Sequence, residues 1–566
     1  MRHIQRKLTA KNMRRIAAAT FVIIIFSSIP MFAASADVSA RCHDISKMDL
    51  PNVTITTAEP IDSGTFTDPI LKKPISNLPP FCRVAATLKP TPDSNIKIEL
   101  WMPEENWNGR FLGTGNGGGA GQIKYSALEL GLRRGFATAN TDMGTSPAAD
   151  LVTGHPERYA DFGYRSTHVM TTVSKTLLAD FYRKPQSRSY FVGCSTGGEQ
   201  ALMEAQRFPG DYNGIVAGAP ANNRTHLHTG FLWNLKATNS SPGEQLSWAT
   251  IAWINHSVIM ACAGKDGGSP EDDFLTDPRE CKFSPATLPK CSGVNTAHCL
   301  TDAQLTALKQ IYAGPTNRQT GERIYTPIPV GSELSRWGLL EQENPVRMYP
   351  SLATYPFEWA FGAKFNYLKF DYDRDMDVVD GKLARVLNAN NPDLSQLQKR
   401  GGKLLMFTGT ADPLVPYQDA LNYYDRVLEN QQKTLAKSHN SDEQQALVET
   451  QDFFRYFLVP GMDHCNSGPG LHDFGQELKL NVPLDSSHDL LTALVGWVEE
   501  GKSPDSILAT TYLDDKPEKG IEMQRPICPY PEFPDYIGGD WKSASSYRCT
   551  AHPMGMVLAP AKRYLN

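Results

Sequence analysis

Residues 193–198 read Gly193-Cys194-Ser195-Thr196-Gly197-Gly198 and contain the G-x-S-x-G pattern of a nucleophile elbow. The pattern alone is common by chance and also fits an ordinary Gly/Ser turn. Its flanks favour the elbow, because the β-favouring run 189–192 precedes it and the helix-forming run 199–206 follows it. A strand, a tight glycine turn and a helix expose a serine hydroxyl above a sheet. The stretch therefore predicts that Ser195 is a nucleophile.

Strands and helices alternate on both sides of this stretch. We expect strands at 97–102, 110–113, 136–140, 214–218, 403–408 and 453–459, and helices at 166–182, 416–429 and 486–500. Residues 37–85 are rich in Pro, Thr and Ser and read as irregular, and residues 430–450 as an exposed loop or frayed helix. The alternation predicts the α/β class, as an α/β-hydrolase fold with a large inserted lid domain.

The strand–helix rhythm stops near residue 222 and returns near residue 403. The stretch between is rich in Trp, Tyr, Pro and Gly, and we interpret it as the lid, with a helix at 301–313. The predicted organisation is a signal peptide at 1–36, the first part of the hydrolase domain at 37–222, the lid at 223–390 and the second part of the hydrolase domain at 391–566. The 566 residues suffice for such a domain with an insertion.

Two further residues complete a nucleophile–base–carboxylate arrangement in the chain order Ser, Asp, His. Asp412 follows the strand at 403–408, and His464 follows the strand at 453–459. A serine hydroxyl needs an imidazole to take its proton and a carboxylate to orient that imidazole. Alternatives stay open: Asp412 before a proline also fits a simple turn, His464 fits a surface loop, and Asp463 is a second candidate carboxylate.

An oxyanion hole requires two backbone N–H groups that point at the developing negative oxygen. The amide of Thr196 is one candidate. The glycine-rich stretch after the strand at 110–113 offers the other, from Gly117 or Gly118. This stretch also fits a flexible linker or a phosphate-binding loop, but no G-x-G-x-x-G fingerprint with a suitably spaced acidic residue and no P-loop lysine accompanies it.

The N-terminus has the features of an export signal. Six basic residues precede the apolar run 17–26, and the small-residue site Ala34-Ser35-Ala36 follows it. The apolar run is short for a membrane anchor, which is the alternative. We expect a periplasmic or secreted protein with no membrane association after cleavage. The net charge of −5 gives no reason to expect a nucleic-acid partner.

Ten cysteines, all beyond the signal segment, agree with an oxidising compartment. Five disulfides are the simplest interpretation, and a zinc site is the alternative. We see no C-x-x-C or H-x-x-x-H pair among them to hold zinc.

The combination of Cys194-Ser195, Asp412 and His464-Cys465 resembles the tannase and feruloyl esterase family, which includes the mono(2-hydroxyethyl) terephthalate hydrolase. The segments 331–337 and 525–531 resemble the family as well, so the likeness covers essentially the whole mature chain. The resemblance implies the disulfides Cys42–Cys82, Cys194–Cys465, Cys262–Cys281, Cys291–Cys299 and Cys528–Cys549.

The resemblance also implies a structural calcium site in the lid, after a cysteine. Here the loop that follows Cys262 departs from the family pattern, because Ala263 replaces a carboxylate and the spacing after Asp266 is two residues longer. Asp266 and Asp272, with Asp273 or Asp277 and the carbonyl of Gly268, still form a candidate oxygen shell for Ca²⁺, and a solvated acidic loop is the alternative.

We expect an exported serine carboxylesterase that needs no cofactor for catalysis. The resemblance implies an aromatic acyl group, such as hydroxycinnamate, gallate or a terephthalate-like acid, in a small-molecule or plant-polymer ester. The lid residues Arg336, Trp337, Phe361 and Tyr367 fit either a substrate pocket or the lid core. An acyltransferase on the same scaffold and a non-catalytic binding protein that retains the fold are the alternative functions.

Overall fold

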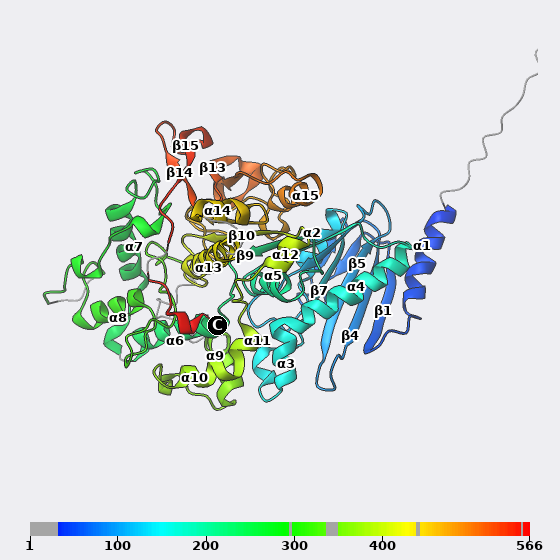
Figure 1. Ribbon diagram of the computed structural model, residues 1–566, viewed down its shortest axis with the longest axis horizontal. Helices are drawn as coiled ribbons and strands as arrows, with labels where there is room; N and C mark the ends of the chain where they lie inside the picture. Colours follow the sequence, from blue (N-terminus) through cyan, green and yellow to red (C-terminus); the bar gives the residue numbers. More distant parts are fainter. Residues whose placement is uncertain are drawn as a thin grey trace, which may run out of the picture.

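The centre of the computed structural model is a nine-stranded sheet with the strand order β1-β4-β5-β7-β6-β8-β9-β10-β11 (Figure 1). The structure describes residues 32–240, 242–293, 297–335, 349–436, 442–555 and 558–565. The six strands from β7 to β11 in this order are parallel, and β1, β4 and β5 extend the sheet in antiparallel fashion. The strands are β1 (Val53–Ile61), β4 (Phe81–Leu88), β5 (Ile96–Pro103), β6 (Arg110–Thr114), β7 (Ala137–Thr141), β8 (Arg188–Cys194), β9 (Gly214–Gly218), β10 (Lys403–Gly409) and β11 (Phe454–Val459).

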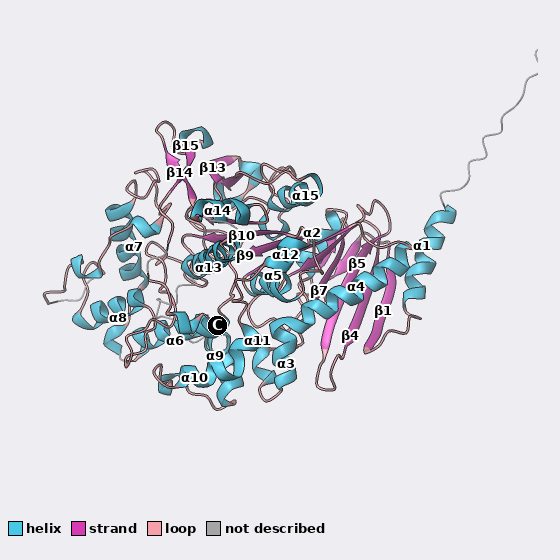
Figure 2. Ribbon diagram, viewed as in Figure 1, coloured by secondary structure: helices cyan, strands magenta, loops and turns pink. Residues whose placement is uncertain are grey.

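Helices cover both faces of this sheet (Figure 2), which explains why central strands such as β8 and β9 are almost wholly buried. One face packs against Leu177 of α4, Leu202 of α5 and Leu421 of α13, and the other against Leu494 of α15. The helices around the sheet are α1 (Phe32–Ile45), α2 (Tyr125–Arg133), α3 (Pro156–Ala160), α4 (Ser166–Tyr182), α5 (Thr196–Arg207), α12 (Ser395–Lys399), α13 (Tyr417–Leu435), α14 (Glu443–Gln451) and α15 (Leu490–Glu500).

Between β9 and β10 the described residues form helices and loops and add no strand to the central sheet. These helices gather at the left and bottom of Figure 1 and belong to the segment that was predicted to form the lid. They are α6 (Arg224–Asn239), α7 (Trp248–Cys262), α8 (Asp302–Ala313), α9 (Tyr349–Phe361), α10 (Asp375–Val379) and α11 (Arg385–Leu387). The exact domain boundaries stay a prediction.

Three small two-stranded sheets complete the fold. They pair β2 (Thr65–Thr67) with β3 (Pro74–Ser76), β12 (Ile507–Tyr512) with β13 (Ile521–Ile527), and β14 (Glu532–Tyr536) with β15 (Tyr547–Ala551). The last pair stands beside the lid helix α7 in Figure 1.

One sequence-based expectation about secondary structure is wrong, and a second, which left a loop and a frayed helix open, underestimates the extent of helix. Residues 37–85, expected to be irregular, include β1 and the start of β4, which pair at the edge of the central sheet. Strand β1 is only half-buried, and several of its positions are threonines. The alternation of apolar and polar residues that marks a strand is therefore weak in its sequence. Residues 430–450 were expected to be a loop or frayed helix, but α13 continues to Leu435 and α14 begins at Glu443.

All ten cysteines form disulfides, and no cysteine is free. The pairs are those that the family resemblance implied: Cys42–Cys82, Cys194–Cys465, Cys262–Cys281, Cys291–Cys299 and Cys528–Cys549. The zinc alternative is therefore wrong, because no thiolate remains to bind a metal.

Residues 1–31 of the expected signal peptide lie outside the described residues, and residues 32–36 begin α1. None of the helices in the described part of the chain combines the length and the apolar character that crossing a bilayer requires.

Candidate active site

Ser195 lies in the sharp turn between β8 and α5, as the elbow pattern predicted. Its φ of 65° and ψ of −121° are strained for a residue with a side chain, and its N–H donates to the carbonyl of Gly218 at 2.9 Å. The turn requires glycine on both sides, because a Cβ on Gly193 would lie 2.4 Å from the carbonyl oxygen of Gly197. The local sequence thus lifts Ser195 above the carboxyl end of the sheet.

His464 and Asp412 come from the loops after the neighbouring strands β11 and β10. His464 Nδ1 lies 2.7 Å from Asp412 Oδ2. The other carboxylate oxygen, Oδ1, accepts the N–H groups of Leu414 and Val415 at 2.9 and 3.0 Å, so the fully buried Asp412 is held as an acceptor. Because a carboxylate accepts, His464 Nδ1 carries the proton and Nε2 is left as the basic nitrogen.

Asp463, the alternative carboxylate, has a different role in the structure. Its Oδ1 accepts the backbone N–H of His464 at 2.7 Å, and both of its oxygens lie 2.8 Å from Ser335 Oγ. Burial raises the pKa of Asp463 to about 6. The hydrogen bond to the imidazole therefore belongs to Asp412, and Asp463 shapes the loop that carries His464.

The charges around His464 favour its protonated form. Burial by itself would lower the pKa of the imidazole, but the charge of Asp412 and its hydrogen bond, with the charges of Asp463 and Glu477, raise it above its ordinary value. An imidazolium that forms during a reaction is thereby stabilised.

The disulfide Cys194–Cys465 joins the elbow to the loop of His464 across 271 residues of sequence. Each cysteine is the direct neighbour of a candidate catalytic residue, so the bond limits how far Ser195 and His464 can separate. Both of these residues line one cavity.

The N–H groups of Thr196 and Gly117 face no backbone or side-chain acceptor among the described residues. The hydroxyl of Thr196 donates to the carbonyl of Gly118 at 2.6 Å, which fastens the glycine-rich loop to the elbow. Gly117 also borders open space, since nothing lies within 4 Å of an added Cβ. The N–H of Gly118 also has no acceptor among the described residues, and both glycines line the cavity, so both remain candidates for the second oxyanion donor.

The cavity above Ser195 has a volume of about 480 Å³, a size that suits a small organic ligand. Its apolar wall comes from Ala221, Leu227, Phe231, Leu414 and Val415, and its polar lining beyond the predicted residues comes from Asn116, Lys124, Arg224, His228, Asn466 and Glu477. None of these eleven residues belongs to a recognisable motif. The signal that was available is the position of α6, which follows directly after β9 at the carboxyl edge of the sheet.

Both cations of this cavity are already paired. Arg224, which is 3% exposed, donates from Nε to Glu199 Oε2 at 2.8 Å, from Nη2 to the hydroxyl of Thr196, and from Nη1 to that of Tyr355. Lys124 Nζ lies 2.8 Å from Glu477 Oε1. The described lining therefore has little net charge.

The lid residues named as pocket candidates lie elsewhere. Phe361 packs against Phe365 and Phe370, and Tyr367 packs at the edge of the neighbouring core; neither lines the cavity. Arg336 and Trp337 lie outside the described residues. The lid-core interpretation fits the half-buried Tyr367, whereas Phe361 is 39% exposed and belongs neither to the cavity nor to the core.

The residues of the expected calcium site converge but fit a guanidinium better than Ca²⁺. The side chain of Arg525 is fully buried and lies 2.5 and 2.9 Å from the two oxygens of Asp272. The oxygens of Asp266 accept the N–H groups of Gly268 and Thr276 at 3.2 and 2.6 Å. The loop also contains Glu271, Asp273 and Asp277, but a cation already neutralises Asp272, and Asp277 pairs with Arg279, whereas Ca²⁺ takes six to eight oxygen ligands. The present arrangement of Asp266, Gly268 and Asp272 therefore does not fit Ca²⁺, and calcium binding by this protein stays a prediction that a Tm measurement with Ca²⁺ tests.

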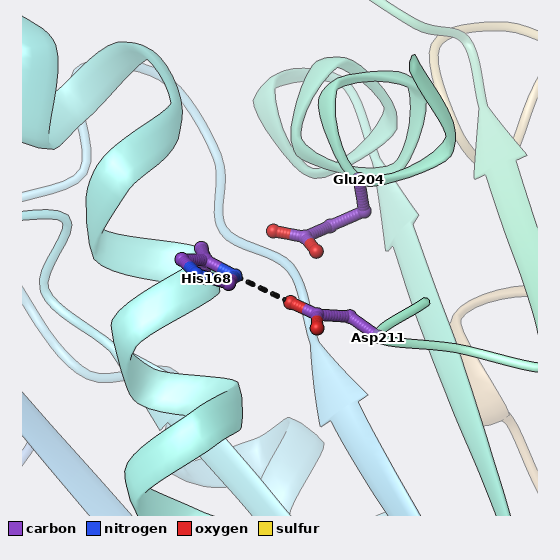
Figure 3. Close-up of side chains that lie close together, drawn as sticks. All are labelled: His168, Glu204 and Asp211. Atoms are coloured by element: carbon purple, nitrogen blue, oxygen red, sulfur yellow. Dashed lines mark hydrogen bonds and ion pairs between the residues drawn. The ribbon is translucent and has the colours of Figure 1, made fainter. Parts of the chain in front are cut away.

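A second cluster of titratable groups lies away from the cavity, between α4 and α5 (Figure 3). His168 Nδ1 is 2.6 Å from Asp211 Oδ2, and the carboxyl group of Glu204 points toward both. Glu204 is fully buried, and burial together with the charge of Asp211 raises its pKa well above the ordinary value. Lys175 donates to the carbonyl of Asp211 beside this group. Because the ammonium of Lys175 is a resident cation, we interpret the cluster as a buried acidic pair and not as a metal site.

Comparisons with known proteins agree with this site. The family described as "Tannase and feruloyl esterase" matches residues 82–550. An "uncharacterized esterase" of Xanthomonas campestris is 36% identical over 97% of this chain and 98% of its own, and feruloyl esterase C of Talaromyces stipitatus is 31% identical over 90% and 94%. The crystal structure of feruloyl esterase B from Aspergillus oryzae superposes with a TM-score of 0.81 at 27% identity, covering 91% of this chain and all of that one.

Proposed function

Because the chain belongs to the tannase and feruloyl esterase family, and so is a carboxylic ester hydrolase with an α/β-hydrolase fold, we propose that it cleaves aromatic acid esters with the triad Ser195, His464 and Asp412. The observation that carries the proposal is the 2.7 Å contact between His464 Nδ1 and Asp412 Oδ2 in a loop that a disulfide joins to the elbow of Ser195.

The reaction proceeds through an acyl-enzyme. Ser195 Oγ attacks the ester carbonyl while His464 Nε2 takes its proton, and the N–H groups of Thr196 and of Gly117 or Gly118 stabilise the oxyanion. The tetrahedral intermediate then releases the alcohol, which receives the proton from His464. A water molecule, activated by the same imidazole, hydrolyses the acyl-enzyme and restores Ser195.

The acyl group lies against the apolar wall formed by Leu227, Phe231, Leu414 and Val415. A planar aromatic acid suits this wall because ring burial is favourable and the wall contributes no charge. The activities for which the relatives are named, feruloyl esterase above all, support an aromatic acyl group and a plant-derived ester as substrate.

The test is hydrolysis of methyl ferulate, methyl gallate, mono(2-hydroxyethyl) terephthalate and a short aliphatic ester by the purified protein. We expect the aromatic esters to be preferred, and we expect Ser195→Ala and His464→Ala to lower kcat at least 10³-fold. Ser545→Ala, an exposed serine of the C-terminal hairpin, is the matched control. Retained turnover in Ser195→Ala, or failure of a fluorophosphonate probe to label Ser195, would refute the triad; product partition with added alcohols detects acyl transfer.

We also propose that the protein is exported. The basic and apolar N-terminus and the five disulfides support this, since such bonds persist in oxidising compartments. N-terminal sequencing of the protein from periplasmic and culture fractions should find Asp37 as the first residue. Recovery of the intact N-terminus in the cytoplasm would contradict export.

A further inference from the structure

His228 lies on α6, one turn after Arg224, and its imidazole has a defined tautomer. Nδ1 is 3.1 Å from the carbonyl oxygen of Ala353, which can only accept, so Nδ1 carries the proton. Burial, helped by the charge of Arg224, lowers the pKa of His228 to about 3, and the ring is neutral at all working pH values. Phe231 and Tyr355 pack edge-on against it at 5.1 and 5.0 Å between ring centroids, which holds its orientation.

The second ring nitrogen, Nε2, is therefore a hydrogen-bond acceptor, and it has no donor anywhere in the described structure. A buried acceptor without a partner is costly, and such groups in native proteins call for an explanation. His228 is 1% exposed and belongs to the wall of the cavity that contains Ser195. The natural source of the missing donor is a ligand in that cavity.

The other polar side chains of the cavity limit the chemical class of ligand that it would bind. Arg224 and Lys124, the cations of the described lining, are each paired with a carboxylate, so a carboxylate on the acyl group would find no free positive charge there. A hydroxyl would instead find the free acceptor of His228. Leu227 and Phe231, which flank His228 on the same helix and also line the cavity, would contact the apolar part of the same acyl group.

We propose that His228 is a specificity-determining residue, whose Nε2 accepts a hydrogen bond from a phenolic hydroxyl of the acyl group. The enzyme then favours hydroxylated aromatic acids over otherwise identical acids that lack the hydroxyl, carry it as a methyl ether or bear a carboxylate in its place. This inference rests on the proposed function, because it places the acyl group of an ester in the cavity.

The experiment compares kcat/KM for three matched esters: methyl 4-hydroxycinnamate, methyl cinnamate and methyl 4-methoxycinnamate. We expect the wild-type protein to prefer the hydroxylated ester about 10-fold, in line with one hydrogen bond to a neutral group. In His228→Phe the preference should fall below about 2-fold, mainly through loss of activity on the hydroxylated ester. His228→Gln, which can present an amide oxygen near the position of Nε2, should retain part of the preference.

Leu227→Ala is the matched control, because it alters the apolar wall without removing a polar atom or either ring that packs against His228. It should change the kcat/KM of all three esters by a similar factor. A purely structural role of His228 would likewise lower all three values together in His228→Phe, and that result would overturn the proposal. Equal turnover of the three esters by the wild-type protein would overturn it without any variant.

Binding to the Ser195→Ala protein separates this inference from the proposed function. We expect its Kd for methyl 4-hydroxycinnamate to be about 10-fold lower than that for methyl cinnamate, measured by calorimetry. If this binding preference is found but the wild-type protein hydrolyses none of the esters, the proposed triad is refuted and the role of His228 is supported. If the wild-type protein hydrolyses the esters but the Ser195→Ala protein binds both with equal affinity, the triad is supported and the role of His228 is refuted.

Discussion

Three carboxylates surround the imidazole of His464, and they act at different ranges. Asp412 bonds directly to Nδ1, Asp463 bonds to the backbone of the same residue, and Glu477 acts through its charge while it pairs with Lys124. Glu477 has a left-handed backbone, with φ of 52°, in the wall of the cavity. A strained acidic residue beside a catalytic base is a means of adjusting the pKa of that base.

The first prediction concerns the pH dependence that these charges produce. In the proposed triad His464 must be neutral to accept the proton of Ser195, and its raised pKa moves the acid limb of kcat/KM upward in pH. Glu477→Gln removes a nearby negative charge and leaves Lys124 unpaired, so the pKa of His464 falls and the acid limb moves to lower pH. We expect activity at pH 5.5, relative to that at the optimum, to rise about 3-fold.

The measurement is a pH profile of kcat/KM on methyl ferulate, with the exposed Glu518→Gln as the control that should leave the limb in place. An acid limb that stays put or moves upward in Glu477→Gln would contradict this account of the site.

At the scale of elements, loops at the carboxyl ends of β6, β8, β10 and β11 deliver the site, and one disulfide joins two of them. The second prediction is that Cys194→Ala with Cys465→Ala lowers kcat/KM about 10²-fold, because an error of about 1 Å in the position of a catalytic group costs that much. The yield of exported protein should fall far less.

Cys291→Ala with Cys299→Ala is the control for this change, since it removes a lid disulfide that encloses a short segment remote from Ser195 in sequence. Its specific activity should remain close to that of the wild-type protein. Unchanged specific activity in the Cys194/Cys465 variant would show that the bond serves stability alone.

The third prediction concerns the packing of α4 against α5 at Glu204. The pKa of Glu204 is raised in the folded protein, so its contribution to stability is present below its unfolded pKa and is lost as pH rises through the folded value. Glu204→Gln removes the cost of burying a charge, and we expect it to raise Tm by a few degrees at pH 8 and by much less at pH 5.

Thermal unfolding at the two pH values tests this, with Glu429→Gln on the exposed face of α13 as the control. Destabilisation of the variant at pH 8 would show that Glu204 is ionised and paired in the fold, and equal stabilisation at both pH values would contradict the proposed pH-dependent cost of burying its charge.

At the scale of the whole molecule, the C-terminal strands hold the lid loop through Arg525, whose guanidinium also lies 4.2 Å from the ring centroid of Tyr547. The fourth prediction is that Arg525→Met destabilises the protein by about 3–5 kcal/mol, because it leaves Asp272 as an unpaired buried charge. Added Ca²⁺ or a chelator should leave the Tm of the wild-type protein unchanged.

Arg548→Met, at an exposed position of strand β15 in the neighbouring β14–β15 pair, is the control for the arginine substitution. A rise of the wild-type Tm with Ca²⁺, or a fall with the chelator, would restore the calcium interpretation, since a ligand that binds only the folded state stabilises it.

The sequence predicted those parts of the molecule whose structure depends on residues close together in the chain. Strands such as β9 and helices such as α4 have clear periodicity, and Ser195, Asp412 and His464 each follow a strand, so their convergence was foreseeable. The residues of the cavity wall could not be predicted in the same way, because they depend on contacts between distant segments. Lys124 pairs with Glu477 across 353 residues of sequence, and the tautomer of His228 is set by a backbone carbonyl of α9. The edge strand β1 was missed because half-exposed threonines hide its alternation.

The bond between Cys194 and Cys465 encloses the entire insertion, from the start of α5 to the loop after β11. A protease that cuts a peptide bond anywhere within the insertion therefore leaves the two resulting pieces covalently attached at the site of reaction. Such nicked molecules would migrate as one band on a gel until they are reduced, and the hydroxyl and the imidazole would still face each other in them.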